Sequence, residues 1–80
     1  MAAQAFGLLV SVDEGAARYD VGVTEDGPER GIVIIPMADP EAWRMEGRED
    51  RPHFAATIVG RALHLRSTTG EWPENASYQS

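Results

Sequence analysis

Hydrophobic and polar residues alternate along two consecutive segments near the N-terminus. Every second residue from Phe6 to Val12 is strongly apolar, which is the period of a β-strand with one buried face. Residues 17–24 repeat this period more cleanly, and residues 13–16 between the two segments supply the glycine and acids of a tight turn. The pattern predicts a β-hairpin. The apolar side of its second strand holds Ala17, Tyr19, Val21 and Val23.

A third segment, residues 31–36, is apolar on both faces after the polar turn of residues 25–30. Continuous β-branched runs are typical of strands that are covered on both sides, and a chain this short has little material for two covering layers. Either helices cross both faces or one face meets another protein chain. Ile32 and Ile34 fall on one face, and we expect the other to form an exposed hydrophobic patch. That patch would consist of Leu9, Val33 and Ile35.

Two helices are expected in the second half of the chain. Asp39 followed by Pro40 has the form of a helix start, and this short helix would end around Gly47. Residues 52–66 place their apolar side chains within an arc of about 180° at helical spacing, whereas a strand would put Arg61 in the middle of its apolar face. The longer segment is therefore interpreted as a helix.

These elements predict an α+β fold with a single small domain over residues 1–66. A three-stranded antiparallel sheet, at about residues 5–36, would be followed by a short and a longer C-terminal helix packed on one face. Residues 67–80 are polar and aperiodic and are expected to form a flexible tail, in which Trp72 either folds back or anchors a partner. If the chain instead breaks at Gly60 into two strands, the element order becomes that of a small five-stranded OB-like β-barrel with one helix.

Composition narrows the range of functions. The 80 residues contain no cysteine, which excludes disulfides, thiolate metal sites and cysteine catalysis. A chain of this length buries only about 60–65% of the surface of its unfolded state, so the core is small. The N-terminal apolar stretch has no basic residue before it, and no apolar run approaches the length of a membrane span. We expect a cytoplasmic protein that does not associate with membranes.

The charge of -6 is unevenly distributed. Residues 1–42 contain eight acids and two arginines, whereas residues 43–80 contain five of each. Overall acidity disfavours nonspecific binding to duplex nucleic acid, because phosphate repulsion has to be overcome before contact. Nucleic acid is therefore an unlikely partner, although the stretch from Arg51 to Arg66 has three arginines and no acid.

No pattern supports catalysis or a cofactor. On one helix His53 and His64 would lie about 16 Å apart along the axis, too far to share a metal ion. The acidic residues cluster in predicted turns, where solvation alone explains them, and none of the clusters has calcium-loop spacing. The sequence also lacks a nucleophile elbow and a glycine-rich phosphate loop. We therefore predict no catalytic, cofactor-binding or metal-binding residues.

The favoured hypothesis is a non-catalytic protein-interaction module. It would self-associate into a homo-oligomer such as a dimer, or dock on a larger protein as an accessory, inhibitor or immunity-type subunit. An OB-like module that binds single-stranded nucleic acid and a small enzyme pairing a histidine with a carboxylate are the alternatives. The predicted partner-binding residues are Leu9, Val33, Ile35, Trp72, Arg61 and His64.

Overall fold

Polar turns divide the first part of the chain into three strands. The structure, a computed structural model, describes residues 4–24, 27 and 29–79. The three strands begin and end within two residues of the predicted ranges, so this part of the prediction is confirmed. They are β1 (Gln4–Val12), β2 (Ala16–Gly22) and β3 (Arg30–Pro36). Residues 25–26 and 28 of the predicted turn before β3 lie outside the described residues.

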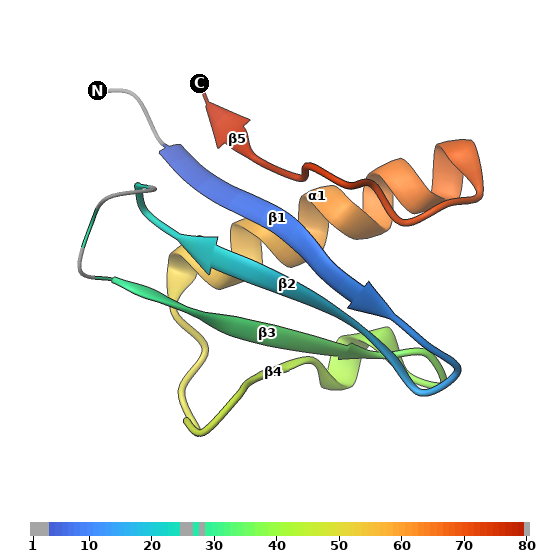
Figure 1. The fold of residues 1–80 in the computed structure, drawn as a ribbon, viewed down its shortest axis with the longest axis horizontal. Coiled ribbons are helices and arrows are strands. Elements are labelled where there is room, and N and C mark those ends of the chain that lie inside the picture. The colour runs from blue at the N-terminus through green and yellow to red at the C-terminus, as the bar shows by residue number, and fades with distance from the viewer. Residues whose placement is uncertain (1–3, 25–26, 28, 80) are drawn as a thin grey trace.

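The sheet is larger than predicted. It has five strands in the spatial order β4-β3-β2-β1-β5, and all neighbours run antiparallel (Figure 1). The α+β class with an antiparallel sheet is confirmed, whereas the predicted number of three strands is too low. The additional edge strands, β4 (Arg44–Met45) and β5 (Tyr78–Gln79), have two residues each. Such short strands carry no alternation that a sequence pattern could reveal.

One helix, α1 (His53–Thr69), covers one face of the sheet (Figure 1). The helix prediction is confirmed, and α1 runs three residues past the predicted end at Arg66. It ends at Thr69 and is capped by Gly70, which has a left-handed φ of 82° and whose N–H donates to the Arg66 carbonyl at 2.8 Å. Gly60 lies inside α1, so the alternative barrel with a break at this glycine is wrong. The buried side of α1 consists of Phe54, Ala55, Ile58, Val59 and Ala62.

The helix lies close to β1 because small residues of β1 face it. Gly7 has no side chain, and a Cβ atom built there would collide with the Ile58 side chain. Ala5 is also buried in the core beneath the helix. Close approach of backbone and helix therefore depends on glycine at position 7.

The short helix predicted to end around Gly47 is wrong. A single 3₁₀ turn, η1 (Pro40–Ala42), takes its place and leads directly into β4. The side chains of Trp43 and Met45 are both buried in the core, and Met45 pairs with Val33 of β3. Two residues spaced by two point to the same side only in an extended chain, so burying both selects a strand over a helix.

The chain after residue 66 belongs to the fold and does not form the separate tail that was expected. Beyond α1 it returns along the outer edge of β1, where the Ala76 N–H donates to the Gly7 carbonyl and the Leu9 N–H to the Glu74 carbonyl, both at 2.9 Å. Ala76 is fully buried. The predicted domain boundary is therefore not a boundary of this fold.

The core lies between the sheet and α1, and it contains the residues that were expected to form an exposed patch. Pairing aligns Leu9, Tyr19 and Val33 across β1, β2 and β3, so their side chains share one face. Val33 and Ile35 are fully buried there, and Leu9 packs against the margin of the same cluster. The prediction of an exposed patch of Leu9, Val33 and Ile35 is wrong, because this is the face that α1 covers.

Among the described residues, no helix has the length and apolarity needed to cross a membrane.

Candidate protein-interaction surface

The face of the sheet opposite α1 is a broad surface that the helix leaves uncovered. Figure 1 looks onto it, with α1 behind the sheet and no described segment in front. The molecule measures 35 × 28 × 18 Å, and its shortest dimension contains the sheet and the helix layer. We call this surface the open face.

Two cross-strand rows of side chains form the middle of the open face. Leu9, Tyr19 and Val33 face α1, so alternation along each strand places their neighbours on this opposite side. The first row, named the Asp20 row, consists of Leu8, Asp20 and Ile32. The second, named the Arg18 row, consists of Ser11, Arg18 and the buried Ile34, with Arg44 paired beside Ile34. Val10 precedes Ser11 in β1 and lies next to this row.

A β-bulge in β1 places Val10 on the open face. The register shifts between Leu9 and Ser11, so that Leu9 is opposite Tyr19 while Ser11 is opposite Arg18. Val10 is the extra residue of the bulge. Bulges redirect side chains at sheet edges, and here the effect is a valine that is 57% exposed.

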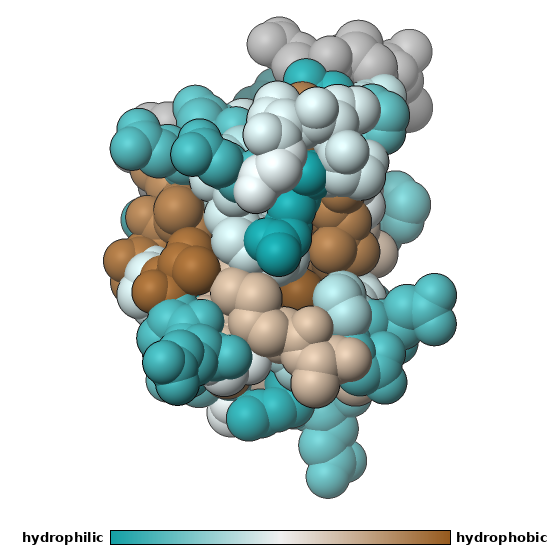
Figure 2. All heavy atoms as spheres, turned by 90° about the vertical axis from the view of Figure 1, so that its right-hand side faces the viewer, coloured by the Kyte–Doolittle hydropathy of each residue, from teal (hydrophilic) through white to brown (hydrophobic). Residues whose placement is uncertain are grey.

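Exposed hydrophobic surface is concentrated on β1. In the described part of the chain, four large hydrophobic side chains are exposed, and three of them belong to this strand. Leu8 is 41% and Val10 is 57% exposed on the open face, while Val12 follows at the end of the strand. Figure 2, which views the end of the molecule at the β1–β2 turn, shows two hydrophobic areas separated by paler and hydrophilic residues.

Both charged residues of β2 on the open face make intramolecular ion pairs. The Arg18 Nη1 atom lies 3.0 Å from Asp13 Oδ2, and Arg30 Nη2 lies 2.6 Å from Asp20 Oδ2. The Arg18 and Asp20 side chains remain 35% and 29% exposed. A guanidinium has five N–H donors and a carboxylate about four acceptor sites, so each can take a second partner.

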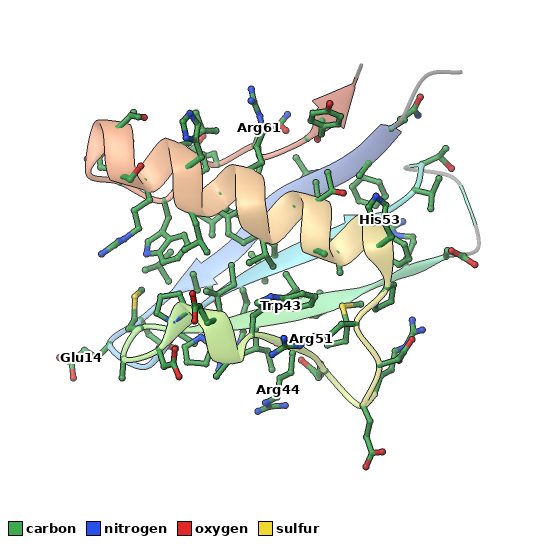
Figure 3. The ribbon with its side chains drawn as sticks, turned by 180° about the vertical axis from the view of Figure 1, so that it is seen from behind. Glu14, Trp43, Arg44, Arg51, His53 and Arg61 are labelled. Carbon is green, nitrogen blue, oxygen red and sulfur yellow. The ribbon has the colours of Figure 1, made fainter. Side chains whose placement is uncertain are left out.

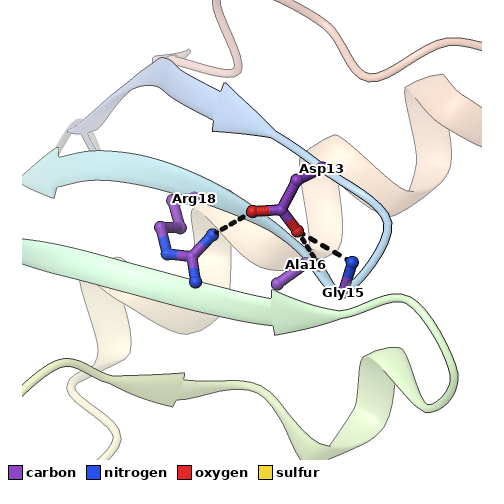
Figure 4. Close-up of polar contacts among 4 residues, drawn as sticks. All are labelled: Asp13, Gly15, Ala16 and Arg18. Carbon is purple, nitrogen blue, oxygen red and sulfur yellow. Dashed lines mark hydrogen bonds and ion pairs between the residues drawn. The ribbon is translucent and has the colours of Figure 1, made fainter.

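Asp13 fixes the end of the hairpin beside this face (Figure 4). Its Oδ1 atom accepts the N–H groups of Ala16 at 2.9 Å and Gly15 at 2.8 Å, while Oδ2 pairs with Arg18. The Ala16 and Gly15 N–H groups and the Arg18 guanidinium hold the pKa of Asp13 below its usual range. The carboxylate thereby connects the turn to the Arg18 row.

A second pair of opposite charges lies at the β4 edge. Arg44 is exposed and pairs in register with Ile34. Glu46 is also exposed, and its backbone N–H donates to the Ile32 carbonyl at 2.8 Å, which continues the register beside the Asp20 row. Across the described residues, neither side chain forms an ion pair within the molecule.

The other predicted partner-binding residues lie away from the open face. Trp72 folds back onto the domain, where its ring centroid is 6.5 Å from that of Tyr19 and 4.7 Å from the Arg66 guanidinium. Arg61 and His64 are exposed on the outer side of α1, and Figure 3 shows Arg61 pointing away from the sheet. Leu9, Val33 and Trp72 are thus brought together around Tyr19, while the two basic residues stay apart from them.

A pocket of about 360 Å³ lies at the start of α1 and contains His53 together with Glu29. Within the described residues, no hydrogen bond or ion pair joins either histidine to a carboxylate, and no group of three metal-ligating side chains is present. The further lining is mostly apolar. It consists of Gln4, Ala5, Val23, Pro52, Phe54, Thr57 and Tyr78.

The residues of the open face that sequence reasoning missed are Leu8 and Val10. Their alternation was visible but was assigned to the buried side of β1. Comparison of the chain with protein-family models, with curated proteins and with solved structures gave no match.

Proposed function

We propose that this chain is a non-catalytic protein-interaction module and that it docks through the open face. The observation that carries the proposal is the asymmetry between the two faces of one sheet. The helix face is closed by α1, whereas the open face exposes Leu8 and Val10 beside charged side chains. An uncovered hydrophobic patch with polar surroundings is typical of a protein-binding surface.

The dimensions are sufficient for a specific interface. A standard interface buries about 800 Å² on each partner. The whole molecule measures 35 by 28 Å in the view onto the open face (Figure 1), an outline of the size that such an interface needs. A role as an accessory, inhibitor or immunity-type subunit requires such a face and no catalytic group.

Site-specific photocrosslinking in the native host tests this proposal. A benzoylphenylalanine at Val10 reports on the open face, and the same residue at Ala56 reports on an exposed position of α1. We expect a discrete protein adduct, identified by mass spectrometry, from position 10 and not from position 56, and we expect Leu8→Glu to abolish it. The absence of a protein adduct at position 10, or equal adducts at both positions, contradicts the proposal.

A nucleic-acid module was the main alternative. It depended on a barrel with a break at Gly60, and that residue lies within α1. Because the barrel is absent, the nucleic-acid alternative loses its structural basis. The hydrophobic side chains of the open face favour a protein partner.

A further inference from the structure

The order of residues on the open face is complementary to itself. On β2, Arg18 and Asp20 occupy positions on either side of the Tyr19 row. On β3 the corresponding positions hold Ile32 and Ile34, of which Ile34 is only 9% exposed. On β1 they hold Leu8 and Ser11, with the bulged Val10 beside Ser11. The two opposite charges of β2 are thus flanked on both sides by strands that carry hydrophobic side chains.

From this order we infer that the partner of the open face is a second copy of the chain, which rests on the function proposed above. The two copies are related by a two-fold axis that lies in the interface and crosses the strands over the Tyr19 row. Rotation about this axis turns the second sheet over and makes its strands antiparallel to those of the first. Sheets that pack face to face are about 10 Å apart and nearly aligned, which accommodates this arrangement.

The rotation places the Arg18 row of each copy over the Asp20 row of the other. Leu8 then lies opposite the bulge of the second copy, which consists of Val10 and Ser11, and Ile32 lies opposite Ile34. Arg18 lies opposite Asp20, once in each direction, because a two-fold interface repeats every contact. Two chains with a net charge of -6 each therefore meet with opposite charges at the centre of contact.

The β4 edge supports the same orientation independently. Glu46 continues beside the Asp20 row, and Arg44 belongs to the Arg18 row. The same axis places Arg44 opposite Glu46 of the second copy, and these two side chains have no ion-pair partner within the described part of the molecule. A two-fold axis parallel to the strands would instead place Arg18 over Arg18 and Asp20 over Asp20. Like charges in contact strongly disfavour that orientation.

The apolar pairs and the charged pairs have different roles in this dimer. Burial of Leu8 and Val10 supplies affinity, because these side chains lose the most water. The charges chiefly select the orientation, because desolvation offsets much of their attraction. Reversing a single charge should therefore abolish a specific arrangement without unfolding the monomer.

Sedimentation equilibrium with purified chains tests the inference. The wild type should have twice its monomer mass of 8.7 kDa at high concentration. Arg18→Glu alone and Asp20→Arg alone should each weaken the dimer by about 100-fold, because each places like charges opposite one another. Mixing the two variants should restore a heterodimer close to wild-type affinity. The double variant, with both charges exchanged, should also dimerise.

Arg61→Glu on the outer side of α1 is the matched control, because it makes the same change of charge away from the interface. It should leave the dimer unchanged, and circular dichroism should show that all variants remain folded. A wild type that stays monomeric at millimolar concentration overturns the inference, as does a dimer that is insensitive to Arg18→Glu or is not restored in the mixture. If position 10 still crosslinks to a different protein, the proposed function stands while the second copy is rejected.

Discussion

At the scale of single residues, Tyr19 joins the sheet to the C-terminal segment. Its side chain is fully buried, and its hydroxyl donates to the Pro73 carbonyl at 2.6 Å. Burial raises the pKa of Tyr19 to about 12. The cause is the low polarity of the core, which disfavours the charged phenolate. One hydroxyl thus connects the middle of the sheet to the chain that closes its edge.

Tyr19→Phe should lower the free energy of unfolding by about 1 kcal/mol at pH 7, because the Pro73 carbonyl loses its donor. The phenol ionises near pH 10 in the unfolded chain and near 12 in the folded one. Its contribution to stability is therefore complete below pH 10 and is lost as the pH rises toward 12. Urea unfolding of the wild type and of Tyr19→Phe at pH 7 and pH 11 measures the difference in unfolding free energy at each pH. An equal difference at both pH values contradicts the assignment, since Tyr78 is common to both proteins.

At the scale of elements, sequence patterns located β1, β2, β3 and α1, because each is long enough to show its period. They could not determine which face of β1 is buried. Counting from the hairpin, where Val12 pairs with Ala17, would place Val10 opposite Tyr19. The bulge puts Leu9 there instead, and a shift of one residue exchanges the faces of a strand. The bulge therefore explains why Leu9 was assigned to the wrong face of β1.

The contact between β1 and α1 gives a second prediction. Gly7→Ala should cost about 1–3 kcal/mol of unfolding free energy, because the new Cβ collides with Ile58. In an Ile58→Ala background the same change should cost far less, since the obstructing methyl groups are gone. Gly60→Ala is the matched control, because a Cβ atom there would meet nothing within 4 Å apart from its chain neighbours and the adjacent backbone of α1. It should stabilise α1 by up to about 1 kcal/mol. Chemical denaturation measures the unfolding free energies of the wild type, Gly7→Ala, Ile58→Ala, the double variant of the two, and Gly60→Ala. If the losses of unfolding free energy from Gly7→Ala and Ile58→Ala are additive in the double variant, the proposed collision is contradicted.

The C-terminal segment could not be recognised from its sequence, because it is polar and pairs through backbone groups. A chain that ends at Gly70 loses Trp72 and Ala76 and uncovers the edge of β1. Loss of a half-buried tryptophan alone should cost about 2 kcal/mol. Thermal unfolding should therefore show a clearly lower Tm than that of the full chain. A chain that ends at Gln79 is the control, because it keeps both residues of β5. Equal Tm values for all three chains would show that residues 71–79 form a separate tail.

At the scale of the whole molecule, charge and shape act in different directions. The chain carries -6, so two copies repel each other at long range, while the open face brings opposite charges together at contact. This complementarity depends on which residues lie side by side on the sheet, and the register of β1, β2 and β3 determines that. Neither the sequence pattern nor the net charge contains that information.

The balance between these two effects predicts how dimerisation depends on salt. The screening length is about 30 Å at 0.01 M and about 8 Å at 0.15 M ionic strength, so repulsion across a molecule of 35 Å acts mainly at low salt. Contacts that exclude water are screened less. We therefore expect the dimer to tighten as sodium chloride is raised over this range, as measured by sedimentation equilibrium. The variant that exchanges Arg18 and Asp20 retains the charge of -6 and should follow the same curve. A dissociation constant that rises steadily with salt would show that the contact pairs dominate over the net repulsion.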